Sequence, residues 1–139
     1  MNQPKILVVD DNPGDIAILK HCLDSLSDGY KLIELGDGEA ALRFVRDERL
    51  LHESDRLPCV MMLDLHLPRF SGLEVLNAVR EEPVLSHVAV VVVSSLASPA
   101  EHAEVISRGA HYRNKPLELD EFRELAAFIL ELCKTGVPA

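Results

Sequence analysis

The chain has 139 residues, enough for one domain with a substantial core but short for two. Apolar residues make up 47% of it, which excludes an intrinsically disordered chain. The formal charge of −9 argues against direct binding to nucleic acid or to an anionic membrane surface. Because no apolar run approaches the ~20 residues of a membrane-spanning helix and no signal-peptide core is present, we expect a cytoplasmic protein.

The three cysteines, Cys22, Cys59 and Cys133, lie far apart in the sequence and in apolar surroundings. No Cys-x-x-Cys motif and no Cys/His cluster connects them, so the sequence does not indicate a cysteine metal site. We therefore expect three reduced thiols packed in the core.

Five short apolar runs alternate with five helical patterns, and no linker divides the chain. The runs that we expect to form strands are Lys5–Val9, Tyr30–Leu35, Cys59–Leu63, Val88–Val93 and a short stretch around Tyr112. The central ones are almost continuously apolar, which is typical of strands that are covered on both faces of a parallel sheet.

The helices are indicated by apolar residues at helical spacing and by capping residues. The expected starts are at Asn12 with Pro13, at Asp37, at Ser71 and at Ser98 with Pro99, and the last helix is expected from about Glu118 to Cys133. The alternation of strands and helices predicts a doubly wound α/β fold. We expect one domain over residues 1–139, with a core at about residues 4–134.

Polar side chains follow the expected strands at their carboxyl ends: Asp10, Asp11, Asp64, Ser94 and, after the last strand, Lys115. In an open parallel sheet these ends meet at one edge, where binding sites form. We therefore expect three acids, a hydroxyl and a lysine to converge there, an arrangement that core packing does not require.

The three acids predict a magnesium site. Carboxylates at close range raise one another's pKa unless a cation lies between them, and Mg²⁺ prefers such oxygen ligands. A helix cap would explain Asn12 but would not explain two consecutive acids that face a third. Asp64 can in addition attack a phosphoryl group, with Lys115 and Ser94 close to the transferred oxygens.

The segments Ile6–Asp15, Leu63–Gly72 and Tyr112–Pro116, with Ser94 after a valine run, together resemble the receiver domains of response regulators over nearly the whole chain. The resemblance implies a flavodoxin-like (βα)5 sandwich with strand order 2-1-3-4-5. It also implies a two-component signalling protein rather than an enzyme with an external substrate. A histidine kinase would transfer a phosphoryl group to Asp64 in a Mg²⁺-dependent reaction.

The resemblance also implies individual roles. The metal would be bound by the side chains of Asp11 and Asp64 and by the backbone carbonyl of His66, and Asp10 would bind it mostly through water. Ser94 and Tyr112 would form the conformational switch, and Lys115 would pair with the phosphoryl group. In this family the peptide bond that corresponds to Lys115–Pro116 is usually cis.

Some features depart from the common pattern of the family. The stretch before Tyr112 is one residue short and Arg113 stands where an apolar residue is more usual, so the role of Tyr112 as a switch stays open. The segment Leu51–Pro58 lengthens the connection into the third strand. With the run Asp-Asn-Pro-Gly-Asp, it is similar to the small stand-alone receivers that partner phytochrome-type histidine kinases.

Three other functions are possible on such a sheet. A flavin or nucleotide carrier would need a glycine- or hydroxyl-rich turn after the first strand, where this chain has Asp10 and Asp11. A phosphatase of the haloacid dehalogenase type would need an Asp-x-Asp motif there and a capping insertion. A degenerate receiver that only binds proteins would not need the complete set of acids, hydroxyl and lysine.

We expect no output domain, so the signal would pass to an unknown downstream protein or to a second copy of the chain. Phe128 falls off the apolar stripe of the last helix, near Glu121 and Glu124. A large exposed aromatic there would favour a homodimer through the fourth helix, fifth strand and fifth helix. A single exposed apolar residue without a partner explains the pattern equally well.

Overall fold

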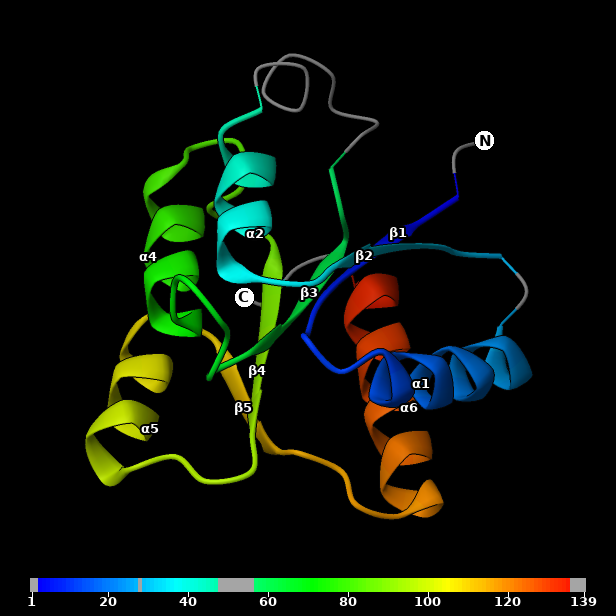
Figure 1. The fold of residues 1–139 in the computed structure, drawn as a ribbon. Coiled ribbons are helices and arrows are strands. Elements are labelled where there is room, and N and C mark those ends of the chain that lie inside the picture. The colour runs from blue at the N-terminus through cyan, green and yellow to red at the C-terminus, as the bar shows by residue number, and fades with distance from the viewer. Residues whose placement is uncertain (1–2, 28, 48–56, 136–139) are drawn as a thin grey trace.

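The computed structural model describes residues 3–27, 29–47 and 57–135, so most of the Leu51–Pro58 segment lies outside the described residues. The elements are β1 (Lys5–Val9), α1 (Pro13–Leu26), β2 (Lys31–Leu35), α2 (Gly38–Val45), β3 (Val60–Asp64), α4 (Gly72–Glu81), β4 (Ala89–Ser94), α5 (Pro99–Ser107), β5 (His111–Asn114) and α6 (Leu119–Thr135) (Figure 1). The expected elements are confirmed, with ends that shift by one or two residues.

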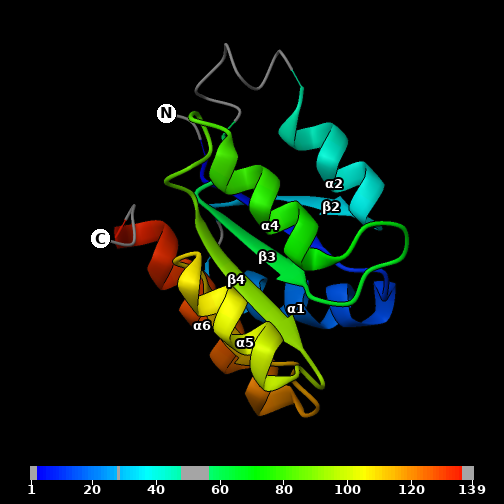
Figure 2. The same cartoon turned by 90° about the vertical axis from the view of Figure 1, so that its left-hand side faces the viewer.

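Within the described residues, the strands form one parallel sheet in the order β2-β1-β3-β4-β5. Helices α1 and α6 cover one face, and α2, α4 and α5 cover the other (Figures 1 and 2). The predicted doubly wound, flavodoxin-like fold with order 2-1-3-4-5 is therefore confirmed. No helix in the described part of the chain is both long and apolar enough to cross a bilayer.

The continuously apolar strands are explained by these two layers. Alternate residues of a strand point to opposite faces, so a strand that is covered on both sides needs apolar residues at every position. In β1, Leu7 and Val9 face α2 and α4, while Ile6 and Val8 face α1 and α6. All four side chains are fully buried, and each such burial contributes roughly 1.5–3 kcal/mol.

Local capping starts the helices that surround the functional edge of the sheet. The Asn12 side chain accepts hydrogen bonds from the N–H groups of Gly14 and Asp15 at the start of α1. Helices α4 and α5 begin with capping boxes at Ser71 and Ser98. The helix starts expected from the sequence are confirmed because each depends on only a few neighbouring residues.

The prediction of three reduced thiols is wrong for two of the cysteines. Cys59, just before β3, and Cys133, near the end of α6, form a disulfide with their Cα atoms 5.1 Å apart. Helix α6 runs back toward the end of the sheet where the strands begin, which brings these residues together across 74 positions of sequence (Figure 1). Cys22 is buried and is a free thiol in the described structure.

The expected exposure of Phe128 is also wrong, because the ring is half-buried. The guanidinium of Arg113 lies 4.1 Å from its centroid, and the His111 ring contacts it edge-on at 5.2 Å. Both residues come from β5, so the strand covers the aromatic side chain that the helix alone would leave exposed. The ring also packs against the core between the sheet and α1 and α6.

Candidate functional site

The carboxyl ends of the strands bring the predicted site residues together. Lys115 Nζ lies 3.0 Å from Asp64 Oδ2 and 3.5 Å from Asp10 Oδ1, although Lys115 and Asp10 are 105 residues apart in the sequence. Asp10 follows β1, Asp64 ends β3, Ser94 ends β4 and Lys115 follows β5. The site therefore forms at one edge of the sheet, from parts of the chain that only the complete fold makes neighbours.

The three acids form a compact cluster. Asp10, Asp11 and Asp64 each place a carboxylate oxygen within 4.8 Å of the others, and Asp10 and Asp64 are only 2% and 5% exposed. Buried Asp10 Oδ2 has no hydrogen-bond partner among the described residues, a costly arrangement unless a cation is present. The all-oxygen donor set and this unpartnered oxygen fit a divalent cation.

Electrostatics at Asp10 lead to the same conclusion. Burial raises the pKa of Asp10 above its usual value of 3.8, and the nearby charges of Asp64 and Asp15 raise it further. The N–H of Asn12 and the ammonium of Lys115 oppose this rise without cancelling it. A cation beside Asp10 would favour its ionised form, because opposite charges stabilise each other in a buried site.

The carboxylate of Asp64 is held by one neighbour at each oxygen. The backbone N–H of His66 donates to Oδ1 at 3.0 Å, and the Lys115 ammonium donates to Oδ2 at 3.0 Å. A buried carboxylate that is held in this way is positioned to act as a nucleophile, as long as an incoming group can displace the ammonium from Oδ2.

Lys115 is fixed in the site by its backbone and by its charge. Its N–H donates to the carbonyl of Ser94 at 2.9 Å, and its side chain is 19% exposed. Burial alone would lower the pKa of Lys115, but the hydrogen bond with Asp64 and the surrounding carboxylates raise it overall, so the amine is protonated at neutral pH. The Lys115–Pro116 bond is not cis, since the described chain has only trans bonds, and the small energy difference allows either form at proline.

Asp15 is a member of the site that the sequence did not single out. Its Oδ2 lies 3.6 Å from Lys115 Nζ, and it adds negative charge next to Asp10. It stands in the first turn of α1, where an acid is favourable for the helix itself. Because an acid in the first turn of a helix is common, nothing in the sequence indicated the contact of Asp15 with Lys115.

Ser94 is 1% exposed and its hydroxyl is already engaged. Its Oγ accepts a hydrogen bond from the N–H of Leu96 at 3.1 Å and lies 3.4 Å from Nδ1 of His66. The resemblance to receiver domains implied only that the backbone carbonyl of His66 binds the metal. The contact between its imidazole and Ser94 depends on a side-chain rotamer that no pattern in the sequence predicts.

Tyr112 lies in β5, beside β4, and is half-buried. Its hydroxyl donates to the carbonyl of Ser94 at 3.5 Å, and its ring contacts the edge of the His102 ring, with centroids 4.6 Å apart. A cavity of about 360 Å³ adjoins the ring, lined by Ala97, Ser98, Pro99, His102, Tyr112 and Asn114. The ring thus has both a link to Ser94 and space beside it, while its role as a switch stays a prediction.

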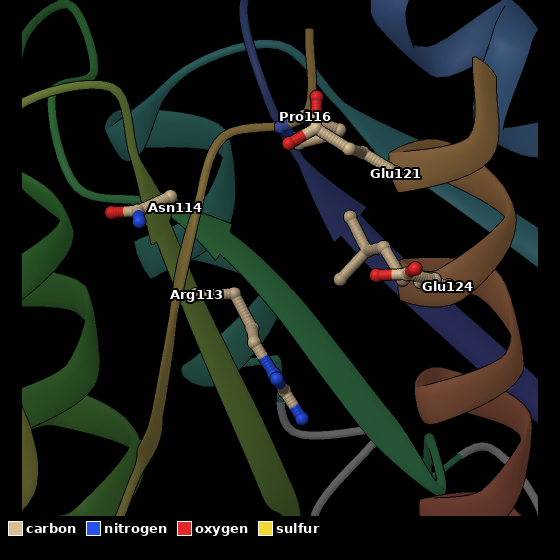
Figure 3. Close-up of a pocket in the computed structure, with 6 residues that line it drawn as sticks. Arg113, Asn114, Pro116, Glu121 and Glu124 are labelled. Atoms are coloured by element: carbon tan, nitrogen blue, oxygen red, sulfur yellow. The ribbon is translucent and has the colours of Figure 1, made fainter. Parts of the chain in front are cut away.

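A separate cavity of about 190 Å³ lies between β5 and α6 (Figure 3). Arg113 and Asn114 line its strand side, and Glu121 and Glu124 line its helix side (Figure 3). Glu121 accepts hydrogen bonds from the N–H groups of Leu117 and Glu118, so this carboxylate holds the start of α6. We therefore assign Glu121 to the start of the helix and not to the acidic cluster.

Comparison with known proteins identifies the family. A model of the response regulator receiver domain matches residues 6–127, and the chain therefore belongs to this family. Receiver domains of this kind take part in two-component signalling, in which a histidine kinase supplies the phosphoryl group. The resemblance stated from the sequence motifs is thereby confirmed.

Two curated relatives illustrate the range of similarity. The chain is 36% identical to response regulator Rcp1 of Synechocystis sp. over 95 residues, which cover 68% of this chain but only 64% of that protein, less than two thirds of its length. It is 26% identical to the polar-differentiation response regulator DivK of Brucella anthropi over 120 residues, covering 86% and 89% of the two chains.

Two solved structures are similar over almost their full length. The Mn²⁺-bound form of response regulator Rcp1 has a TM-score of 0.82 at 27% identity, with 98% of this chain and 99% of that chain covered. The phosphorylated cyanobacterial phytochrome response regulator RcpA has a TM-score of 0.83 at 26% identity, with 99% of each chain covered. Proteins with this fold thus include one crystallised with a divalent metal and one crystallised in phosphorylated form.

Proposed function

We propose that this receiver accepts a phosphoryl group from a histidine kinase on Asp64, in a reaction that requires Mg²⁺. The observation that carries the proposal is the contact between buried Asp64 Oδ2 and the Lys115 ammonium at 3.0 Å, beside the carboxylates of Asp10 and Asp11. This contact supports the proposal because a carboxylate that could act as the nucleophile lies beside a cation for the phosphoryl oxygens and beside further oxygen ligands for a metal.

In the proposed step, a carboxylate oxygen of Asp64 attacks the phosphorus of a phosphohistidine. The P–N bond breaks, an acyl P–O bond forms, and the leaving imidazole takes up a proton to become neutral histidine. Lys115 exchanges its contact with Asp64 Oδ2 for one with a phosphoryl oxygen. Mg²⁺ held by Asp10, Asp11, Asp64 and the His66 carbonyl would supply charge neutralisation at the phosphoryl oxygens when it is bound.

The added phosphoryl group would drive the conformational change. It brings roughly −1.5 to −2 charges and strong acceptor oxygens to the edge of β3. The Ser94 hydroxyl would turn toward one of these oxygens and leave its present partners. Tyr112 would sense the movement through its hydrogen bond to the Ser94 carbonyl.

We further infer that the kinase is of the phytochrome type. Support comes from the similarity to the phytochrome response regulator RcpA and to Rcp1. We also propose that the signal passes to a separate protein in the cytoplasm. A homodimer through α5, β5 and α6 no longer has Phe128 as an exposed contact. Ile106 on α5 and Leu119 on α6, which are 53% and 45% exposed, still support it.

Incubation with Mg²⁺ and acetyl phosphate tests the proposal. Wild type should acquire an acid-stable, hydroxylamine-sensitive mass increase of one phosphoryl group, and Asp64→Asn should not. Asp15→Asn is a matched control, because it removes a neighbouring carboxylate of the site but not the proposed acceptor. Equal hydroxylamine-sensitive labelling of Asp64→Asn would contradict the assignment.

A further inference from the structure

The side chain of His66 connects the Ser94 hydroxyl to the first turn of α5. Its Nδ1 lies 3.4 Å from Ser94 Oγ, and its Nε2 lies 3.3 Å from Oε2 of Glu101. Its backbone N–H donates to Asp64 Oδ1 at 3.0 Å. One residue therefore contacts the proposed phosphoryl acceptor, the proposed switch hydroxyl and the first turn of α5.

Glu101 is an anchored partner for the imidazole. Its Oε1 accepts a hydrogen bond from the N–H of Ser98 at 2.9 Å, and its own N–H donates to Ser98 Oγ at 3.1 Å. This capping box holds the carboxylate against the start of α5 and leaves Oε2 for His66. Because the Glu101 carboxylate is fixed to the start of α5, the contact at His66 Nε2 depends on the position of that helix.

Ser94 Oγ has one partner in the β4–α5 connection and one in the β3–α4 connection. The N–H of Leu96 donates to it at 3.1 Å, and Nδ1 of His66 is its side-chain partner. In the proposed change, the hydroxyl leaves both partners to reach a phosphoryl oxygen on Asp64. Each contact would therefore stabilise the arrangement without the phosphoryl group and oppose the change.

We propose that His66 is a positioning residue that holds the Ser94 hydroxyl in its unphosphorylated orientation and ties it to α5 through Glu101. Phosphoryl transfer would then release Ser94 from His66 and loosen the start of α5 in the same event. This inference rests on the proposed function. Loss of the Nδ1 contact should shift the balance toward the activated form by about two- to tenfold, the range that one hydrogen bond spans.

A purely structural role for this side chain is not supported by its surroundings. The imidazole is 55% exposed, so it contributes little to the packing of the core. Substitution of His66 should therefore leave the fold intact. Its effect should be seen where Ser94 moves, not in global stability.

Three variants separate the two contacts of the ring. Asparagine places a polar atom near the position of Nδ1, so His66→Asn keeps a partner for Ser94. Glutamine places its polar atoms near the position of Nε2, so His66→Gln keeps a partner for Glu101 but not for Ser94. His66→Ala keeps neither.

The first measurement is the affinity of each protein for beryllofluoride, an analogue of the phosphoryl group, at saturating Mg²⁺. His66→Ala and His66→Gln should bind it about two- to tenfold more tightly than wild type, and His66→Asn should bind it as wild type does. The second is amide hydrogen exchange without beryllofluoride. Exchange at Leu96 should be faster in His66→Ala and unchanged in His66→Asn.

The outcomes are distinguishable. If wild type does not bind beryllofluoride, the proposed function fails and the role of His66 fails with it. If wild type binds and all three variants match it, only the role of His66 is overturned. Equal changes in His66→Ala and His66→Asn would also overturn it, because they would show an effect of ring volume and not of the polar contact.

Discussion

Gly72 lies directly against the backbone of Asp64. A Cβ atom at Gly72 would overlap the carbonyl oxygen of Asp64 and come within 2.8 Å of Leu65 Cα. The N–H of Gly72 also donates to the carbonyl of Leu65 at 2.9 Å. The first residue of α4 therefore sets the position of the backbone that carries the proposed phosphoryl acceptor.

Gly72→Ala should lower the free energy of unfolding by about 1–3 kcal/mol, because backbone atoms must move to make room for the methyl group. The displacement should also slow labelling of Asp64 by acetyl phosphate. Urea denaturation and mass spectrometry would measure the two effects. Gly36→Ala is the matched control, since a Cβ there has no described atom within 4 Å beyond Gly36 itself and its two chain neighbours. Equal stabilities of the two variants would contradict the prediction.

Asp10→Asn should stabilise the metal-free protein at neutral pH. Because burial raises the pKa of Asp10, the folded protein retains this proton to higher pH than the unfolded chain does. The stability that protonated Asp10 contributes is therefore lost as pH rises from the pKa of Asp10 in the unfolded chain to its higher pKa in the folded protein. Above the folded-state pKa this stability is absent. The advantage of Asp10→Asn in the unfolding free energy should disappear at acid pH, below the usual value of 3.8.

The same variant should lose most of its response to Mg²⁺. A ligand at a hundred times its Kd stabilises a protein by about 2.7 kcal/mol, which thermal unfolding with and without Mg²⁺ would detect in wild type. Asp15→Asn should keep this response, because Asp15 contacts Lys115 but lies outside the acidic cluster. An undiminished Mg²⁺ response in Asp10→Asn would argue against the proposed metal site.

His111 should make the protein less stable at mildly acid pH. Burial lowers the pKa of His111 below its usual value of 6.5, and the positive charges of Arg113 and Arg80 lower it further. The unfolded chain therefore binds this proton first, so stability is lost as pH falls below about 6.5. His111→Gln should reduce the difference between the unfolding free energies at pH 7 and pH 5. If this difference is the same in His111→Gln as in wild type, His111 does not cause the loss of stability at acid pH.

Reduction of the disulfide between Cys59 and Cys133 should lower stability by about 2–4 kcal/mol, because the bridge closes a long loop in the unfolded chain. Peptide mapping without reductant should find the two cysteines linked, and the double variant Cys59→Ser/Cys133→Ser should unfold at lower urea concentration. Cys22→Ala should keep the response to reductant. A bridge found after alkylation in intact cells would argue against the predicted cytoplasmic location, where thiols are kept reduced.

The parts of the fold that depend on near neighbours could be predicted from the sequence. The cap at Asn12 and the apolar run before Asp64 each reflect a local requirement, and the strand order followed from the resemblance to a known family. The contact of Lys115 with Asp64 was expected because parallel strands end at one edge.

The features that were missed depend on packing between distant elements. The pairing of Cys59 with Cys133 depends on where α6 ends relative to β3, and the burial of Phe128 depends on side chains of β5. The link from His66 to Glu101 depends on a single rotamer. None of these leaves a periodic signal in the sequence, because each is a contact of individual side chains.

The separation of 105 residues between Asp10 and Lys115 has a consequence for how the protein is made. During synthesis, Asp64 emerges from the ribosome well before its lysine partner, and the last strand and helix must join the sheet before the ammonium reaches the carboxylate. Such contacts between distant residues form late, because closing a long loop is slow. On the proposed mechanism, a chain that ends before Lys115 would present Asp64 without its ammonium partner, so competence to accept a phosphoryl group would come only with the finished fold.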